Sequence, residues 1–314
     1  MRIIRHTETV TPDLKGAVVA IGNFDGVHRG HQAVIGQARE IAAGLGAPVV
    51  VLTFEPHPRS LFQPDAPAFR LTSLRSKARL MDGLGVDGLM VLHFDRALAA
   101  MAAEDFVTRI LIGDLGARHV VVGADFAFGR GRQGNVALLK EMGPAGGFAV
   151  TPAVQVCDEG GAVISSNTIR GFLKDGRPEE AARLLGRPWE VDGRVVHGDN
   201  RGQDLGFPTA NVRMDDFLLP RPGIYAVRAA IEGEGEPHWY DGAASFGTRP
   251  HFQGEEPRLE VFLIDYSGDL YGAILRVSFV AYLRPEAAFD SVDALVSQME
   301  QDVIDARAQL KQAL

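Results

Sequence analysis

Two patterns of hydrophobic residues divide the sequence. In its first part, short runs of β-branched and other apolar residues alternate with stretches of helical periodicity. The predicted strands are residues 17–22, 48–54, 88–93, 119–123 and 149–156. Strands that alternate with helices are typical of a parallel sheet with helices on both faces. Such sheets bind ligands beyond the carboxyl ends of their strands, so we expect chemistry near Gly22, where the first strand ends.

An amphipathic helix is predicted between the first two of these strands. The positions that share its apolar face are Val34, Ala38, Ile41, Ala42 and Leu45. Gly46 directly follows them, and we expect it to end the helix.

The pattern changes after about Leu185, where helical periodicity stops. Short runs bounded by Gly, Pro and Asp follow, and they predict strands at residues 190–196, 223–231, 238–245, 259–264 and 273–283. Closely spaced strands with turn signals favour a small antiparallel barrel. We therefore expect two domains, residues 1–186 and 187–314.

A long helix is predicted at the end of the chain. Ser291 is its expected N-cap. The apolar stripe expected to pack against the barrel is Val292, Leu295, Val296, Met299, Val303 and Leu310.

Composition limits the classes of protein that this chain can belong to. Its 314 residues exceed what one hydrophobic core usually serves, which supports two domains. With 32 basic and 40 acidic residues the net charge is −8, so we expect no nucleic-acid partner. The single Cys157 excludes an internal disulfide and a cysteine zinc cluster. No apolar run approaches the ~20 residues of a membrane helix, so we expect a cytoplasmic protein without a membrane partner.

A glycine- and histidine-rich segment lies between the first strand and the first helix, at residues 22–31. Its glycines allow the backbone to approach a ligand, and the helix start presents free N–H groups. His28 and His31 are three residues apart, so both imidazoles can point the same way. This arrangement predicts a phosphate site. The alternative is a turn whose histidines only cap the helix or contact solvent.

The same segment reads Gly-x-Phe-Asp-Gly-x-His-x-Gly-His and resembles the histidine signature of the nucleotidylyltransferase superfamily. In full it is similar to the adenylyltransferase half of the prokaryotic bifunctional riboflavin kinase/FAD synthetases. Further matches to that family follow in order at residues 53–59, 122–129 and 164–170. The fold that the resemblance implies for residues 1–186 is a Rossmann-like nucleotidylyltransferase domain.

The activity implied by the resemblance is transfer of AMP from ATP to the phosphate of FMN, which gives FAD and pyrophosphate. The attacking oxygen is already anionic, so positioning and charge stabilisation suffice without a general base. We assign the charge stabilisation to His28 and His31. The residues expected to bind ATP are Gly22, Asn23, Phe24, Asp25, Gly26, Ser165, Ser166 and Arg170. Those expected to bind the flavin are Phe54, His57, Pro58, Arg59, Asp125, Phe126 and Phe128.

Two features of this first domain are ambiguous. Ser165 and Ser166 are equally consistent with a helix N-cap, and Asn167 stands where the family commonly has Thr, which we expect to tune activity without abolishing it. Residues 129–134 read G-x-G-x-x-G, but they come late in the sheet beside two arginines. We interpret them as a phosphate or flavin loop and not as a dinucleotide fingerprint.

A second motif, Gly206-Phe207-Pro208-Thr209-Ala210-Asn211, lies in the barrel region. No P-loop sequence occurs in the chain, so a kinase would need another phosphate cradle. The oxygens of Thr209 and Asn211 suit a hard cation such as Mg²⁺, although an isolated Pro-Thr-x-Asn is usually a local turn.

This motif is similar to the signature of the flavokinases. Supporting matches follow at residues 222–225, 242–250, 259–263 and 269–272. The resemblance implies a six-stranded barrel that phosphorylates riboflavin, with Glu260 as the general base for a neutral alcohol. The residues expected to bind its ATP are Gly193, His197, Gly206, Pro208, Thr209 and Asn211, with Thr209 and Asn211 also holding Mg²⁺. The departures from the family pattern are Gln203, His251 and Phe262.

Together the motifs predict a bifunctional enzyme that converts riboflavin to FMN and FMN to FAD, with ATP and Mg²⁺. Its expected partners are small molecules only, and a homo-oligomer is compatible with this interpretation. In one rival hypothesis the barrel is a non-catalytic flavin-binding regulatory module. In the other, the first domain is a different adenylyltransferase or cytidylyltransferase.

Overall fold

The computed structural model describes residues 1–5, 10–197, 205–233, 235–251 and 254–312. Contacts divide the chain into two compact units, the first comprising Met1–Ala66 and Leu74–Ile164 and the second Pro67–Ser73 and Ser165–Leu314. The two helices between residues 165 and 186 thus group with the second unit. The domain boundary after Gly186 stays a prediction.

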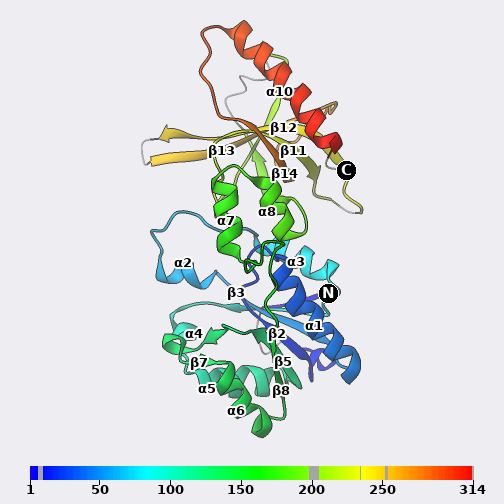
Figure 1. Cartoon of the computed structure of the whole chain (residues 1–314), viewed down its shortest axis with the longest axis vertical. Helices are drawn as coiled ribbons and strands as arrows, with labels where there is room; N and C mark the ends of the chain where they lie inside the picture. Colours follow the sequence, from blue (N-terminus) through cyan, green and yellow to red (C-terminus); the bar gives the residue numbers. More distant parts are fainter. Residues whose placement is uncertain (6–9, 198–204, 234, 252–253, 313–314) are drawn as a thin grey trace. The chain divides into compact units, whose positions relative to one another are not determined.

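The first unit is built on a parallel sheet, as the alternating pattern predicts (Figure 1). Its six strands run in the order β1-β4-β3-β2-β5-β8. They are β1 (Arg2–Ile4), β2 (Val18–Ile21), β3 (Val49–Glu55), β4 (Gly88–His93), β5 (His119–Gly123) and β8 (Ala149–Ala153). β1 was not among the predicted strands, because it is three residues long and only Ile4 of its side chains is buried.

Helices cover both faces of this sheet. Successive residues of a strand point to opposite faces, so neighbouring residues pack against different helices. Val18 and Ala20 pack with α1 (Arg29–Leu45) and α3 (Leu74–Gly83). Val19 and Ile21 pack with the π-helical segment η3 (Phe106–Asp114) and α6 (Val136–Gly146). The shorter elements of the unit are η2 (Pro12–Leu14), α2 (Pro58–Phe62), α4 (Arg96–Ala100), α5 (Ala103–Asp105), β6 (Ala127–Phe128), η4 (Arg130–Arg132) and β7 (Gly134–Asn135).

The second unit contains the predicted antiparallel barrel, closed in the order β10-β13-β12-β11-β14-β9. Its strands are β9 (Trp189–Val196), β10 (Thr209–Val212), β11 (Gly223–Ile231), β12 (Trp239–His251), β13 (Gly254–Leu263) and β14 (Ile274–Arg284). Two helices, α7 (Ser166–Lys174) and α8 (Pro178–Leu185), precede it. The hydrophobic pattern did not reveal β10, which has four residues. It pairs with both β9 and β13 and closes the barrel.

The last helix, α10 (Val292–Gln312), packs against the barrel through its second half. Ser291 caps it, as predicted, by accepting a hydrogen bond from the Ala294 N–H at 3.1 Å. Ala306 and Leu310 are fully buried with residues of β11 and β14. The predicted stripe was wrong at its beginning, because Val292 is 60% exposed in the first turn, ahead of the buried positions.

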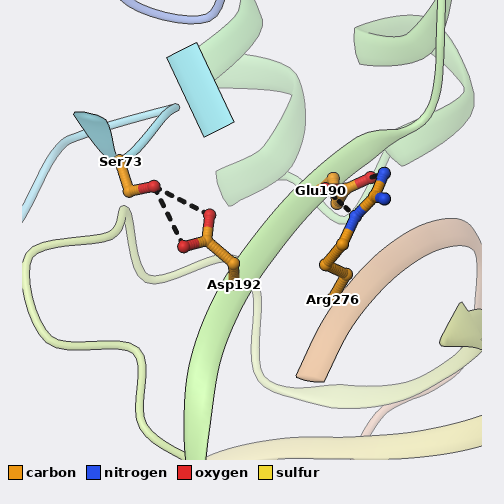
Figure 2. A network of polar contacts seen from close by, with 4 residues as sticks. All are labelled: Ser73, Glu190, Asp192 and Arg276. Carbon is orange, nitrogen blue, oxygen red and sulfur yellow. Dashed lines mark hydrogen bonds and ion pairs between the residues drawn. The ribbon is translucent and has the colours of Figure 1, made fainter. Parts of the chain in front are cut away.

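A short segment that precedes α3, Pro67–Ser73, belongs to the second unit and is bound to it by hydrogen bonds. The indole N–H of Trp189 donates to the Leu71 carbonyl at 3.0 Å. Figure 2 shows the Ser73 hydroxyl donating to both carboxylate oxygens of Asp192, at 2.8 and 3.0 Å. On the same strand, Glu190 forms a two-pronged ion pair with Arg276 of β14 (Figure 2).

Within the described residues, no helix is both long and apolar enough to cross a membrane.

Candidate active sites

The loop after β2 is held in an unusual backbone conformation. Phe24 and Val27 both have positive φ, at 49° and 44°, which is rare for residues with a side chain and especially for a β-branched one. Both side chains are only 1% exposed, so their burial in the core beneath α1 offsets the cost of that conformation. Strain of this kind is concentrated at functional sites. The loop is therefore fixed by the core before any ligand arrives.

The two histidines of the first motif lie together at the start of α1. Their rings stack with centroids 3.6 Å apart and planes 19° from parallel. His28 is the N-cap, since its Nδ1 accepts a hydrogen bond from the His31 N–H at 3.3 Å. Both imidazoles thus lie beside the positive end of a seventeen-residue helix, where anions are favoured.

A large cavity of about 1180 Å³ opens beside this loop in the first unit. All seven residues expected to bind the flavin line it, and so do Gly22 and Asn23 of the expected ATP site. Aromatic rings meet around it: Phe126 and Phe128 stack at 5.5 Å, and Phe54 meets Phe94 edge-on. A wall of this kind suits a flat aromatic ligand.

Several residues that line the cavity were not expected from the sequence. They are Leu61, Phe62, Phe94, Arg96, Met101 and Phe106, among others, whereas Arg130 and Arg132, which also line it, come from the segment interpreted above as a phosphate or flavin loop. Phe94 and Arg96 directly follow β4, so the rule that ligands bind at the carboxyl ends of strands could have found them. Arg130 and Arg132 belong to the glycine-rich loop, and they place positive charge around the cavity.

Ser165, Ser166 and Arg170 lie in the second unit, where two of them have structural roles. Ser165 caps α7 by accepting from the Thr168 N–H at 3.1 Å, as the alternative interpretation anticipated. Arg170 donates to the Phe69 carbonyl and, at 2.7 Å, to Asn167. The contribution of these residues to the first ATP site stays a prediction.

In the barrel, strand register brings the predicted kinase residues together. Asn211 of β10 pairs directly with Glu260 of β13, and Glu260 pairs on its other side with Ser245 of β12. Thr209 lies two residues along β10 and pairs with Phe262. Directly opposed residues share a face, with Cβ atoms about 5 Å apart. The hydroxyl of Thr209, the amide oxygen of Asn211 and the carboxylate of Glu260 therefore lie on one face of the sheet. These three residues are half-buried, whereas the residues that alternate with them along the strands are buried on the other face.

This set of oxygens fits a hard divalent cation that keeps ATP phosphates and water among its ligands. In the part of the chain that the structure describes, no group of three or more His, Cys, Asp and Glu residues is arranged to hold a metal by itself.

The other residues expected at the second ATP site differ in what explains their positions in the structure. The ring of His197 stacks on that of Tyr271 at 3.9 Å. Gly206 has a φ of +84° and open space around it, so its conformation requires glycine. A Cβ on Gly193 would lie 2.0 Å from the Arg213 carbonyl, so packing of the strands explains that glycine. Pro208 directly precedes β10.

Two of the three departures from the family pattern in the barrel lie within the described residues. Phe262 meets Phe207 edge-on at 5.3 Å, and His251 is the last residue of β12. Gln203 lies outside the described residues.

Comparison with known proteins finds relatives for both parts of the chain. Residues 10–168 match the family model of FAD synthetase, and residues 185–310 match that of riboflavin kinase. Proteins described as bifunctional riboflavin kinase/FMN adenylyltransferase are 41% identical in Pseudomonas fluorescens and 42% identical in Escherichia coli K12, each over 98% of this chain and 97% of the relative. The corresponding protein of Bacillus subtilis is 36% identical over 92% of this chain and 91% of its own.

A solved structure has the same arrangement of elements. It is described as a macrolide-efflux protein from Streptococcus pneumoniae, is 34% identical, and covers 97% of this chain and 98% of its own, with a TM-score of 0.85. The two family models match residues in both units, and the curated relatives cover more than nine-tenths of the chain. The chain therefore belongs to the bifunctional riboflavin kinase/FMN adenylyltransferase family.

Proposed function

We propose that this bifunctional enzyme performs its two reactions at separate sites, one built around the histidine pair of the first unit and the other in the barrel. The chain is a riboflavin kinase, which makes FMN from riboflavin and ATP, and an FMN adenylyltransferase, which makes FAD from FMN and ATP. The observation that carries the proposal is the separation of the two residue sets. His28 and His31 stack in the first unit, whereas Asn211 and Glu260 pair in the barrel.

AMP transfer takes place at the loop after β2. FMN lies in the adjacent cavity among its aromatic side chains, and its phosphate attacks the α-phosphate of ATP in line. No base is required, because the attacking oxygen is already an anion. His28 and His31 donate to oxygens whose negative charge increases as pyrophosphate leaves, with the helix N-terminus adding to the same field.

Phosphorylation of riboflavin takes place on the outer face of the barrel. The 5′-hydroxyl of riboflavin is neutral, so a carboxylate that accepts its proton speeds attack on the γ-phosphate. Glu260 is that base. Thr209 and Asn211, on the same face, would hold the cation that accompanies ATP.

Enzymes that transfer groups from ATP use the nucleotide with a divalent cation, and we take this one to be Mg²⁺. When bound, Mg²⁺ would neutralise charge on the ATP phosphates at each site. The use of ATP supports the expected cytoplasmic location. The partners are the small molecules riboflavin, FMN, FAD and ATP.

Two single substitutions test the separation of the sites, and each serves as the control for the other. His31→Ala should slow FAD formation from FMN by about 10²- to 10³-fold while FMN formation continues. Glu260→Gln should slow FMN formation from riboflavin by about 10²- to 10⁴-fold while supplied FMN is still converted to FAD. Chromatography of the flavin products measures both. If Glu260→Gln leaves FMN formation unchanged, the assignment of Glu260 as the base is wrong.

A further inference from the structure

A buried lysine lies directly behind the loop of the adenylyltransferase site. Lys77 is on α3, and only 2% of its surface is exposed. Lysine is almost never fully buried unless its ammonium group has polar partners, because desolvating the charge is costly. Neither the sequence motifs nor the proposed reactions use this residue. Its position therefore needs an explanation.

The ammonium group of Lys77 has partners in and beside the loop. Nζ donates to the Asn23 carbonyl at 2.9 Å and to the Thr53 hydroxyl at 3.3 Å. Thr53, fully buried on β3, donates to the same Asn23 carbonyl at 3.1 Å. Two side chains from two different elements thus hold one backbone carbonyl of the loop.

Holding that carbonyl fixes the peptide between Asn23 and Phe24. Because the peptide is planar and trans, a carbonyl turned toward Lys77 sends the Phe24 N–H to the opposite side. Phe24 is also the first of the two residues with positive φ in this loop. Gly22 and Asn23 line the cavity, so the fixed peptide borders the site itself. A charge-assisted hydrogen bond from a buried ammonium is stronger than a neutral one, and it suits a fixed backbone element.

We propose that Lys77 is a positioning residue for AMP transfer. It holds the Asn23 carbonyl, and through it the backbone of the loop from Gly22 to His28, in the conformation that binds ATP. This inference rests on the proposed adenylyltransferase site. Lys77 touches neither substrate. It determines whether the loop is set for reaction before ATP binds, and Thr53 assists it.

The first test replaces Lys77 by Met, which keeps a stem of similar length and removes the charge. In the full-length chain, kcat for FAD formation from FMN should fall by about tenfold or more, while KM for ATP changes by less than about threefold. Riboflavin kinase activity of the same preparation should stay unchanged, which shows that the barrel is folded, and far-UV circular dichroism equal to that of the unmodified chain checks that the first unit is folded too. The matched control is Lys140→Met, which removes an exposed lysine of α6 and should alter neither activity.

A second set of variants uses the other donor to Asn23. Thr53→Ser keeps the hydroxyl and should keep the activity, whereas Thr53→Val removes it and should lower kcat in the same reaction. If both donors act through Asn23, the double variant Lys77→Met with Thr53→Val should lose less than the product of the two single losses. A residue that only supported the fold would lower the amount of folded enzyme and would not give this pattern in kcat.

The outcomes separate this inference from the proposed function. Failure of the unmodified chain to form FAD from FMN would overturn the proposed function. Normal FAD formation by the unmodified chain and also by folded Lys77→Met, within about threefold, would overturn the role of Lys77 alone. If Lys77→Met does not fold, the Thr53 variants decide, and equal kcat for Thr53→Ser and Thr53→Val overturns the proposal.

Discussion

At the scale of single residues, Gly30 allows the His28 ring to pack closely against the first turn of α1. A Cβ added at this position would lie 3.1 Å from both Cε1 and Nδ1 of His28, tighter than ordinary van der Waals contact. The His28 ring cannot simply move aside, because it stacks on His31 and caps the helix. The glycine of the motif is therefore needed for the position of its histidines.

We expect Gly30→Ala to shift the His28 ring and slow FAD formation by about 10- to 100-fold, because small displacements of catalytic groups are costly. Riboflavin kinase activity should not change. Steady-state kinetics of both reactions measure the effect. The matched control is Gly36→Ala on the same helix, where an added Cβ meets nothing within 4 Å. It should leave both activities unchanged and stabilise the helix by up to about 1 kcal/mol. Normal FAD formation by Gly30→Ala would contradict the proposed role of the imidazole pair.

The histidine pair could be predicted from the sequence, and the buried lysine could not. His28 and His31 follow a strand within a glycine-rich motif, a local signal that needs no tertiary contact. Lys77 lies in the charged segment 74–79, which reads as a solvated helix face, and its burial depends on how α3 packs beside β3 and the loop. Ser165 lies between these cases, since both of its interpretations were consistent with the sequence and the capping contact is the one observed.

At the scale of elements, the attachment of α10 depends on one polar contact as well as on its apolar face. Asp302 is 5% exposed and accepts two hydrogen bonds of 2.7 Å from Arg284 of β14. Gln298, one turn earlier, donates to the same carboxylate. A carboxylate in a stripe of apolar residues would be unfavourable without these partners. The amphipathic pattern predicted the helix and its cap but not this ion pair.

Removing the carboxylate should weaken the attachment of the helix. Asp302→Ala leaves the Arg284 guanidinium largely buried without its counter-ion, and we expect the free energy of unfolding to fall by about 3 kcal/mol. The matched control is Asp305→Ala on the exposed side of the same helix, with an expected change of less than about 0.5 kcal/mol. Denaturant titration of both variants measures the difference. Equal stabilities would mean that the apolar residues alone hold α10.

Long, periodic elements were predicted well, and short ones were not. The strands Gly88–His93, His119–Gly123 and Gly223–Ile231 have the predicted bounds, because each is a continuous apolar or alternating run. β1 and β10, with three and four residues, carry too little periodicity. The segment Pro67–Ser73 was missed for another reason. It has no regular structure, and its place in the second unit depends on hydrogen bonds to residues more than a hundred positions away.

At the scale of the whole molecule, two chemically different ATP-dependent steps share one chain. The first unit starts from a substrate whose nucleophile is already charged, and it offers donors and a helix N-terminus. The barrel starts from a neutral alcohol, and it offers a carboxylate beside oxygens that suit a cation. This difference follows from the chemistry of the two nucleophiles.

The most direct measurement follows the phosphorus atoms of ATP. Riboflavin is incubated with the enzyme, Mg²⁺ and ATP labelled at either the γ- or the α-phosphate, and the flavins are separated and counted. The γ-label should enter FMN and be carried into FAD, whereas the α-label should enter FAD only. Absence of γ-label from FMN, or appearance of α-label in FMN, would contradict the claim that riboflavin receives the γ-phosphate of ATP and FMN receives its AMP.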